Sequence, residues 1–163
     1  MIPPRPRLID DALLDAVTEE ARASPRLRRN RNFHSSDDHP GHRLLNAIEP
    51  GSYVAPHRHL DPLKDETMVV LRGCLGLVIF ADGGQVSASH RLGPGQPSGL
   101  GVDIPHGTWH SVVALQPGTV FLEAKAGPYR PLTAEERAPW APQEGSPEAR
   151  DYEALLAGRF ADR

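Results

Sequence analysis

Three histidines stand at positions from which their imidazoles could converge on one metal ion. A single residue separates His57 from His59, and alternate residues of a β-strand point to the same face. His110 lies far along the chain, after a turn that Pro105 and Gly107 favour. Neutral imidazole is a good ligand for first-row transition metals near neutral pH. The spacing therefore predicts that the two segments meet around a divalent ion.

Carboxylate, amine and phenol groups could complete this site. Glu66 follows the histidine pair and is a candidate fourth ligand or acid; a solvent-facing or ion-paired strand residue is the alternative. Tyr53 shares strand parity with His57, so its hydroxyl could enter a cavity. Glu123 and Lys125 share one face of a late strand and become acid/base candidates if that face is inward, or surface charges if it is outward. The candidate catalytic residues are Glu66, Tyr53, Glu123 and Lys125, and the candidate metal ligands are His57, His59, Glu66 and His110.

A basic cluster precedes these residues. Its members are Arg22, Arg26, Arg28, Arg29 and Arg31. It could bind a phosphate or a nucleotide-sugar, whereas a solvated face with local ion pairs is the competing interpretation.

The elements that position the site are predicted to be short strands. The chain of 163 residues has 17 prolines and 15 glycines, which short strands joined by tight turns absorb and long helices do not. Strands are expected at 43–48, 52–57, 66–72, 75–80, 85–91, 100–104, 109–114 and 119–125. About eight short strands in this span indicate a sandwich or small barrel.

The two ends of the chain differ from this pattern. Leu13, Leu14, Val17 and Ala21 have helical spacing, and Ser24-Pro25 should end that helix. The stretch 26–41 is expected to be an irregular connection. Beyond residue 128 the chain is rich in proline and weakly helical over 148–160, which we interpret as a tail that wraps the barrel.

Bulk composition excludes several classes of protein. The net charge is -3, which gives no indication of nucleic-acid binding. No stretch approaches the ~20 apolar residues of a membrane helix, and the N-terminus lacks the features of a secretory signal. Cys74 is the single cysteine, so no internal disulfide can form. These features predict a cytoplasmic protein with neither nucleic-acid nor membrane partners.

Glycine-spaced blocks around the histidines resemble the two motifs of the cupin superfamily. The first motif, G-x5-H-x-H-x3,4-E-x6-G, is matched by Gly51, His57, His59, Glu66 and Gly73. The second, G-x5-P-x-G-x2-H-x3-N, is matched by Gly99, Pro105, Gly107 and His110. Two departures are that six residues separate His59 from Glu66, and that Ala114 occupies the final Asn position.

The likeness extends along nearly the whole chain to the WbuC-type cupin fold metalloproteins. It is carried by the segments Ala23-Ser-Pro-Arg-Leu-Arg, Arg43-Leu-Leu-Asn-Ala-Ile-Glu-Pro-Gly, Pro56-His-Arg-His, Val69-Val-Leu-Arg-Gly, Ile104-Pro-His-Gly-Thr-Trp-His and Gly127-Pro-Tyr. This resemblance implies a small metal-binding cupin associated with bacterial surface-polysaccharide genes. It does not supply a substrate.

These observations together predict an all-β protein: a single cupin barrel of the jelly-roll (double-stranded β-helix) type. We expect an N-terminal helix and connection over 1–42, the barrel over 43–128 and a proline-rich tail over 129–163. The barrel should hold one divalent transition metal ion per chain, of iron, manganese, nickel, copper or zinc. The favoured function is a metal-dependent enzyme of isomerase, lyase or dioxygenase type that acts on a small polar or anionic molecule, such as a sugar or sugar-derived acid. The alternative is a non-catalytic module that binds or senses a small molecule; in either case we expect a homodimer.

Overall fold

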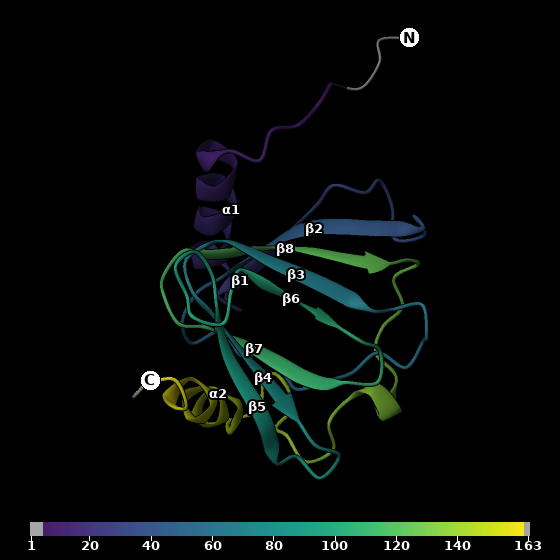
Figure 1. Cartoon of the computed structure of the whole chain (residues 1–163), viewed down its shortest axis with the longest axis vertical. Coiled ribbons are helices and arrows are strands. Elements are labelled where there is room, and N and C mark those ends of the chain that lie inside the picture. Colours follow the sequence, from purple (N-terminus) through teal and green to yellow (C-terminus); the bar gives the residue numbers. More distant parts are fainter. Residues whose placement is uncertain (1–4, 162–163) are drawn as a thin grey trace.

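Eight strands and two α-helices make up the protein in a computed structural model that describes residues 5–161 (Figure 1). The strands are β1 (Arg28–Asn32), β2 (Gly41–Ile48), β3 (Glu66–Arg72), β4 (Leu75–Phe80), β5 (Val86–Leu92), β6 (Gly101–Ile104), β7 (Trp109–Ala114) and β8 (Thr119–Ala126). The helices are α1 (Asp11–Ala23) and α2 (Ala149–Gly158), with a short 3-10 helix η1 (Ala134–Glu136) between β8 and α2. No helix within the described residues is long and apolar enough to cross a membrane.

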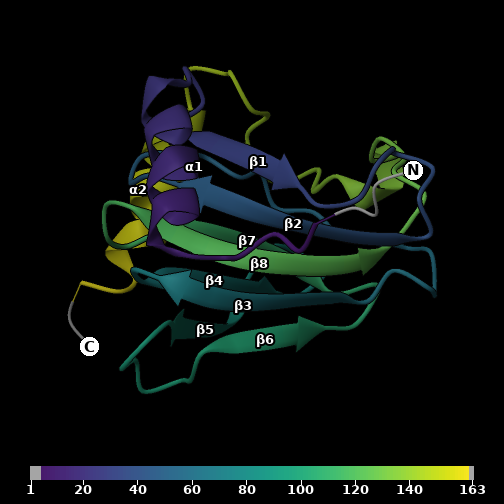
Figure 2. The same ribbon diagram turned by 90° about the horizontal axis from the view of Figure 1, so that it is seen from above.

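The strands form two antiparallel sheets that face each other as a jelly roll. One sheet has five strands in the order β1-β2-β8-β3-β6, and the other has three in the order β5-β4-β7. Figure 2 shows the five-stranded sheet from outside, with α1 lying across one end of it. Most neighbouring strands in the sheets are distant in sequence. As a result β3 and β8 of one sheet and β7 of the other face the same interior.

Strand parity decides which side chains face that interior. Alternate residues of a strand point to opposite faces. Met68 of β3, Leu77 of β4, Val112 of β7 and Phe121 of β8 belong to one buried cluster between the sheets. Residues at the same parity as these therefore also face inward, and they include Glu66, His110, Glu123 and Lys125.

The two α-helices cover the outer faces of the sheets. Asp10 caps the start of helix α1, and its side chain accepts a hydrogen bond from the Leu13 amide at 3.0 Å. Its buried face packs Val17 and Ala21 against Leu45 of β2. Helix α2 covers the three-stranded sheet, where Leu156 joins a cluster formed with Val78, Phe80, Trp109 and Val113. These clusters bury the outer faces of β2, β8, β4 and β7, which fixes the inward face of these strands.

Most of the predicted strands are confirmed, and two segments differ. Strands β3, β4 and β7 have the predicted bounds, and the other four predicted strands that form lie within two residues of theirs. Residues 52–57 form no regular strand, and only His57 makes an isolated bridge. The stretch 26–41 was expected to be irregular, but it contains β1, which pairs with β2 and extends the five-stranded sheet. This strand was missed because its residues, Arg-Arg-Asn-Arg-Asn, have no apolar alternation.

Gly73, at the corner between β3 and β4, is closely packed against Thr119. Its φ is +80°, and a Cβ at this position would lie 2.8 Å from the Thr119 Cα. Gly95 has a similar φ of +74° and has nothing within 4 Å of the same point. We expect Gly73→Ala to lower the free energy of unfolding by about 3 kcal/mol or more, and Gly95→Ala by about 1 kcal/mol. Urea denaturation of both variants measures the difference; equal losses would contradict the close approach to Thr119.

Candidate metal centre

The four predicted ligands come together from three separate parts of the fold. Glu66 begins β3 in one sheet, and His110 lies on β7 in the other. His57 and His59 belong to the segment between β2 and β3. The His57 amide donates to the His110 carbonyl at 3.0 Å, and the His110 amide donates back to the His57 carbonyl at 2.9 Å. This pair of main-chain hydrogen bonds joins the two histidine blocks.

A second main-chain contact aligns the other histidine. The Gly107 amide donates to the His59 carbonyl at 2.6 Å. Gly107 has a φ of +79°, in the left-handed region that favours glycine. The turn that precedes His110 therefore orients two segments of the site at once.

The resulting cluster is compact and buried. One ligand atom from each of His57, His59, Glu66 and His110 lies within 4.8 Å of the others. The Glu66 Oε2 atom is 3.3 Å from the Nε2 atoms of both His59 and His110. Glu66 is 3% exposed and His110 1%. Glu66 therefore lies against the histidines despite its longer spacing from His59.

Main-chain carbonyls set the orientation of two of the rings. The His57 Nδ1 atom is 3.0 Å from the Ala55 carbonyl oxygen, and the His110 Nδ1 atom is 2.9 Å from that of Thr108. A carbonyl oxygen can only accept, so each Nδ1 carries the hydrogen and each Nε2 keeps its lone pair. Metal-binding histidines are typically held in this way by an outer acceptor.

Two buried polar atoms of this cluster have no hydrogen-bond partner among the described residues. They are Glu66 Oε2 and His110 Nε2. Buried polar groups are rarely left unpaired, because each costs the energy of its lost hydration. A divalent cation bound to both atoms would satisfy them. Three imidazole nitrogens and a carboxylate are also a donor set that first-row transition metals accept. The residues present thus fit a metal ion.

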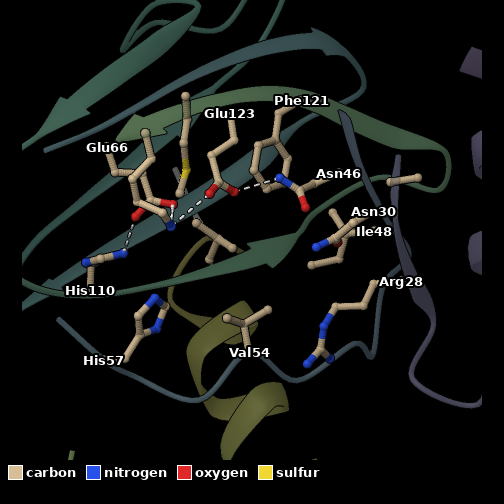
Figure 3. Close-up of a pocket in the computed structure, with 14 residues that line it drawn as sticks. Arg28, Asn30, Asn46, Ile48, Val54, His57, Glu66, His110, Phe121 and Glu123 are labelled. Atoms are coloured by element: carbon tan, nitrogen blue, oxygen red, sulfur yellow. Dashed lines mark hydrogen bonds and ion pairs between the residues drawn. The ribbon is translucent and has the colours of Figure 1, made fainter. Parts of the chain in front are cut away.

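A line of polar side chains continues from the cluster along the five-stranded sheet (Figure 3). The Lys125 Nζ atom lies 3.4 Å from Glu66 Oε1 and 3.3 Å from His59 Nε2, and it donates to Glu123 Oε1 at 2.9 Å. Asn46 of β2 donates from Nδ2 to Glu123 Oε2 at 2.8 Å. Glu123 and Lys125 therefore face inward, which was the condition for their being acid/base candidates.

Burial and these contacts shift the ionisation of the groups. Burial, with a smaller contribution from His110, lowers the pKa of His57 to about 3, so this ring is neutral near pH 7. Burial also raises the pKa of Glu123 to about 7, and the charge of Glu66 adds to the shift. Burial alone would lower the pKa of Lys125, but Glu66 and Glu123 outweigh it, so the pKa lies above its ordinary value. For Glu66, the contacts with His110, His59 and Lys125 outweigh burial and hold its pKa well below the usual range.

Tyr53 lies away from this cluster. Its hydroxyl donates to the Pro142 carbonyl at 2.7 Å, and its ring packs edge-on against Tyr152. Burial raises the pKa of the phenol. Tyr53 is not among the residues that line the cavity beside Glu66. Strand parity with His57 was a poor guide here because residues 52–57 form no regular strand.

The five arginines of the basic cluster do not act together. Arg22 pairs with Glu19 and Glu49, and Arg29 and Arg31 pair with Glu20. Arg28 alone among them lines the cavity that also contains Glu66 and His110. Asn46 also lines it. Sequence reasoning did not assign either residue to the site, because their positions depend on the register between β1, β2 and β8.

The cavity beside the ligands is small and has mixed walls. Its volume is about 180 Å³. Apolar side chains line it, including Ile48, Val54, Met68, Val112 and Phe121. Polar groups occur at the metal-ligand side and around Arg28. This arrangement is typical of a small-molecule site, in which apolar walls exclude water and a few polar groups fix orientation.

Comparison with known proteins identifies a family and a fold. A family model described as "Domain of unknown function (DUF6016)" matches residues 9–92, which include three of the four candidate ligands. No curated protein matches the chain. Among solved structures, the polyketide cyclase RemF from Streptomyces resistomycificus is 21% identical, with a TM-score of 0.51 over 80% of this chain and 83% of that one. KdgF from Halomonas sp. is also 21% identical, with a TM-score of 0.50 over 66% and 84%.

An RmlC-like cupin protein from Desulfovibrio desulfuricans is 22% identical and covers 61% of this chain and 81% of its own, with a TM-score of 0.44. The predicted fold class, an all-β jelly roll of the cupin type with a short N-terminal helix, is confirmed by the two facing antiparallel sheets and by the fold shared with RemF and KdgF.

Glu66 provides the sharpest test of the cluster as a metal site. We expect Glu66→Gln to weaken zinc binding at least about tenfold, because the substitution removes the one negatively charged ligand of the cluster. Glu123→Gln is the matched control: it removes a carboxylate from the same cavity but not from the four-residue cluster. Competition with a chelator measures both affinities. Equal affinities in the wild type and Glu66→Gln would show that the imidazoles bind metal without this carboxylate.

Proposed function

This chain belongs to the DUF6016 family, a domain of unknown function, and we propose that it is a metal-dependent enzyme that acts on a small polar or anionic molecule. The observation that carries the proposal is a pair of buried atoms, Glu66 Oε2 and His110 Nε2, that have no hydrogen-bond partner within residues 5–161 and lie in a cluster of three imidazoles and a carboxylate. We propose one divalent ion per chain, of iron, manganese, nickel, copper or zinc, held by His57, His59, Glu66 and His110.

A bound ion of this kind would polarise a substrate oxygen or lower the pKa of a bound water. The chain's own residues would then handle protons and orientation. Lys125 holds a proton at Nζ beside the ligands, and Glu123 fixes that ammonium group at 2.9 Å. Asn46 in turn holds Glu123 through a hydrogen bond of 2.8 Å. A substrate in the cavity would meet a positioned proton donor at one wall and a paired carboxylate behind it.

These inward-facing proton-handling groups favour an enzyme over a non-catalytic binding module. A module that only binds needs no ammonium group fixed between two buried carboxylates. Buried charges lose their hydration, and this cost is offset only when they pair with each other or with a ligand. Isomerase, lyase and dioxygenase chemistry all remain open to such a site, because the fold alone does not choose among them.

The finer parts of the proposal concern substrate and setting. We propose a sugar or sugar-derived acid as substrate and a link to surface-polysaccharide metabolism, on the resemblance of the chain to WbuC-type cupins. We also propose a cytoplasmic location. A homodimer would protect β1 and β6, the outer strands of the five-stranded sheet, each of which pairs with one other strand within residues 5–161.

Proton transfer inside the cavity can be measured directly. Metal-loaded protein is incubated in D₂O with a panel of sugar acids and sugar phosphates, and proton NMR follows both new products and loss of exchangeable C–H signals. We expect at least one compound to react, and Lys125→Met to slow that reaction about 100-fold or more, as is typical for loss of a general acid or base.

Lys64→Met is the matched control, because Lys64 lies outside the residues that line the cavity. It should leave the rate close to that of the wild type, with thermal midpoints confirming that both variants fold. Compounds that bind the metal-loaded protein but undergo neither exchange nor conversion would instead identify a binding module.

A further inference from the structure

An unbalanced positive charge lies at the side of the cavity away from the metal ligands. Arg26 makes two hydrogen bonds to Glu144, at 2.6 and 2.9 Å, and Arg28 shares the same carboxylate at 2.8 Å. The two guanidinium groups and one carboxylate together carry a net charge of about +1, because arginine stays protonated in proteins. The charge is held partly out of water, since the Arg28 side chain is only 17% exposed.

The position of Arg28 on β1 of the five-stranded sheet directs its side chain into the cavity. Residues of β1 alternate, so Arg28 and Asn30 face the interior while Arg29 and Arg31 reach Glu20 on α1. In the register with β2, Arg28 lies opposite Ile48 and Asn30 opposite Asn46. Figure 3 shows Arg28 across the cavity from Glu66 and His110.

Arg28 also marks the boundary between two spaces. It lines the inner cavity of about 180 Å³, and it lines an outer groove of about 530 Å³ that is formed with the segment Leu132–Glu144. His57 and Val54 likewise line both. Arg28 and the metal ligand His57 therefore both lie where the two spaces meet, so a ligand that reaches the inner cavity from the groove can contact the guanidinium and the metal end together.

The guanidinium retains hydrogen-bonding capacity for a ligand. It has five N–H groups. Nη1 contacts the Tyr53 carbonyl at 2.9 Å and the Ser52 hydroxyl at 3.4 Å, and Nη2 contacts Glu144. At most three N–H groups are engaged by these contacts. Nε–H and one N–H of Nη2 make no hydrogen bond within residues 5–161, so they can donate to the oxygens of a ligand, and the contacts already made hold the group in place.

We propose that Arg28 is a specificity-determining residue that binds a carboxylate of the substrate while an oxygen at the other end of the same molecule reaches the metal ligands. The inner cavity has less volume than the ~300 Å³ at which drug-sized sites begin, so the part of the ligand inside it is small. Its apolar walls, including Ile48 and Phe121, would contact a short carbon chain between the two polar ends. This inference rests on the proposed function, because it takes the four-residue cluster as the metal end.

Binding measurements on 2-oxo acids test this assignment. Zinc-loaded protein is titrated calorimetrically with oxaloacetate, 2-oxoglutarate and 2-oxoadipate, which offer a second carboxylate at increasing distance, and with pyruvate, which lacks it. We expect at least one of the three to bind about tenfold or more tightly than pyruvate. A gain of this size is typical of a charge-assisted hydrogen bond. Arg28→Gln should abolish that difference and leave pyruvate binding unchanged.

Two further variants separate charge from geometry. Arg29→Gln removes the same charge from the outward face of the same strand and should keep the full preference. Arg28→Lys keeps the charge but loses the planar fork, so it should retain only part of the preference. Zinc content and thermal midpoint are measured for each variant, so that loss of folding is not mistaken for loss of the subsite.

The outcomes distinguish the two proposals. A protein that takes up none of iron, manganese, nickel, copper or zinc contradicts the proposed function. A protein that binds zinc but shows no preference for any dicarboxylate over pyruvate contradicts the role of Arg28. Equal losses in Arg28→Gln and Arg29→Gln also contradict it, because they would reduce the effect to general surface charge.

Discussion

The interaction on which the site depends is the burial of one carboxylate, Glu66, against the Nε2 atoms of two histidines. An ionised carboxylate out of water is costly unless opposite charge and hydrogen bonds compensate it. Lys125 contacts one oxygen of Glu66, whereas the other oxygen has no hydrogen-bond partner among residues 5–161. Main-chain acceptors turn the Nε2 lone pairs of His57 and His110 toward the same point. A cation at that point would satisfy Glu66 Oε2 and the Nε2 atoms together, while Glu123, held by Asn46, offsets the charge of Lys125.

The four residues can meet because strands that are distant in sequence place their inward-facing side chains in the same interior. Strands β3 and β8 place Glu66 opposite Lys125 in the same sheet, and β7 supplies His110 from the facing sheet. The apolar residues that follow each polar one on the inner face, such as Met68 and Val112, form the core beyond the site. Helices α1 and α2 cover the outer faces, so a shift of any strand by one residue would expose core and bury charge.

Much of this could be predicted because the relevant signals are local. Glycine and proline mark the corners of β3, β4 and β7, and the spacing of the histidine blocks, with their resemblance to the cupin motifs, indicates the candidate ligands. The inward face of β8 could be stated only as a condition, because parity leaves two choices and the packing of α1 decides between them. Arg28 was predicted only as one member of a basic cluster that could bind an anion, and its place at the cavity was missed for a related reason. Strand β1 faces the polar cavity on one side and Glu20 on the other, so it carries no apolar pattern. Tyr53 was instead placed in the cavity by strand parity, and this was wrong because residues 52–57 form no regular strand.

Metal content measures the central claim most directly. Protein purified without an affinity tag is analysed for first-row transition metals, and the same analysis is applied to a His57→Ala, His59→Ala double variant. Three imidazoles and a buried carboxylate predict close to one divalent ion per wild-type chain and almost none in the double variant. A wild-type protein that is free of metal and takes up none of iron, manganese, nickel, copper or zinc would contradict the account.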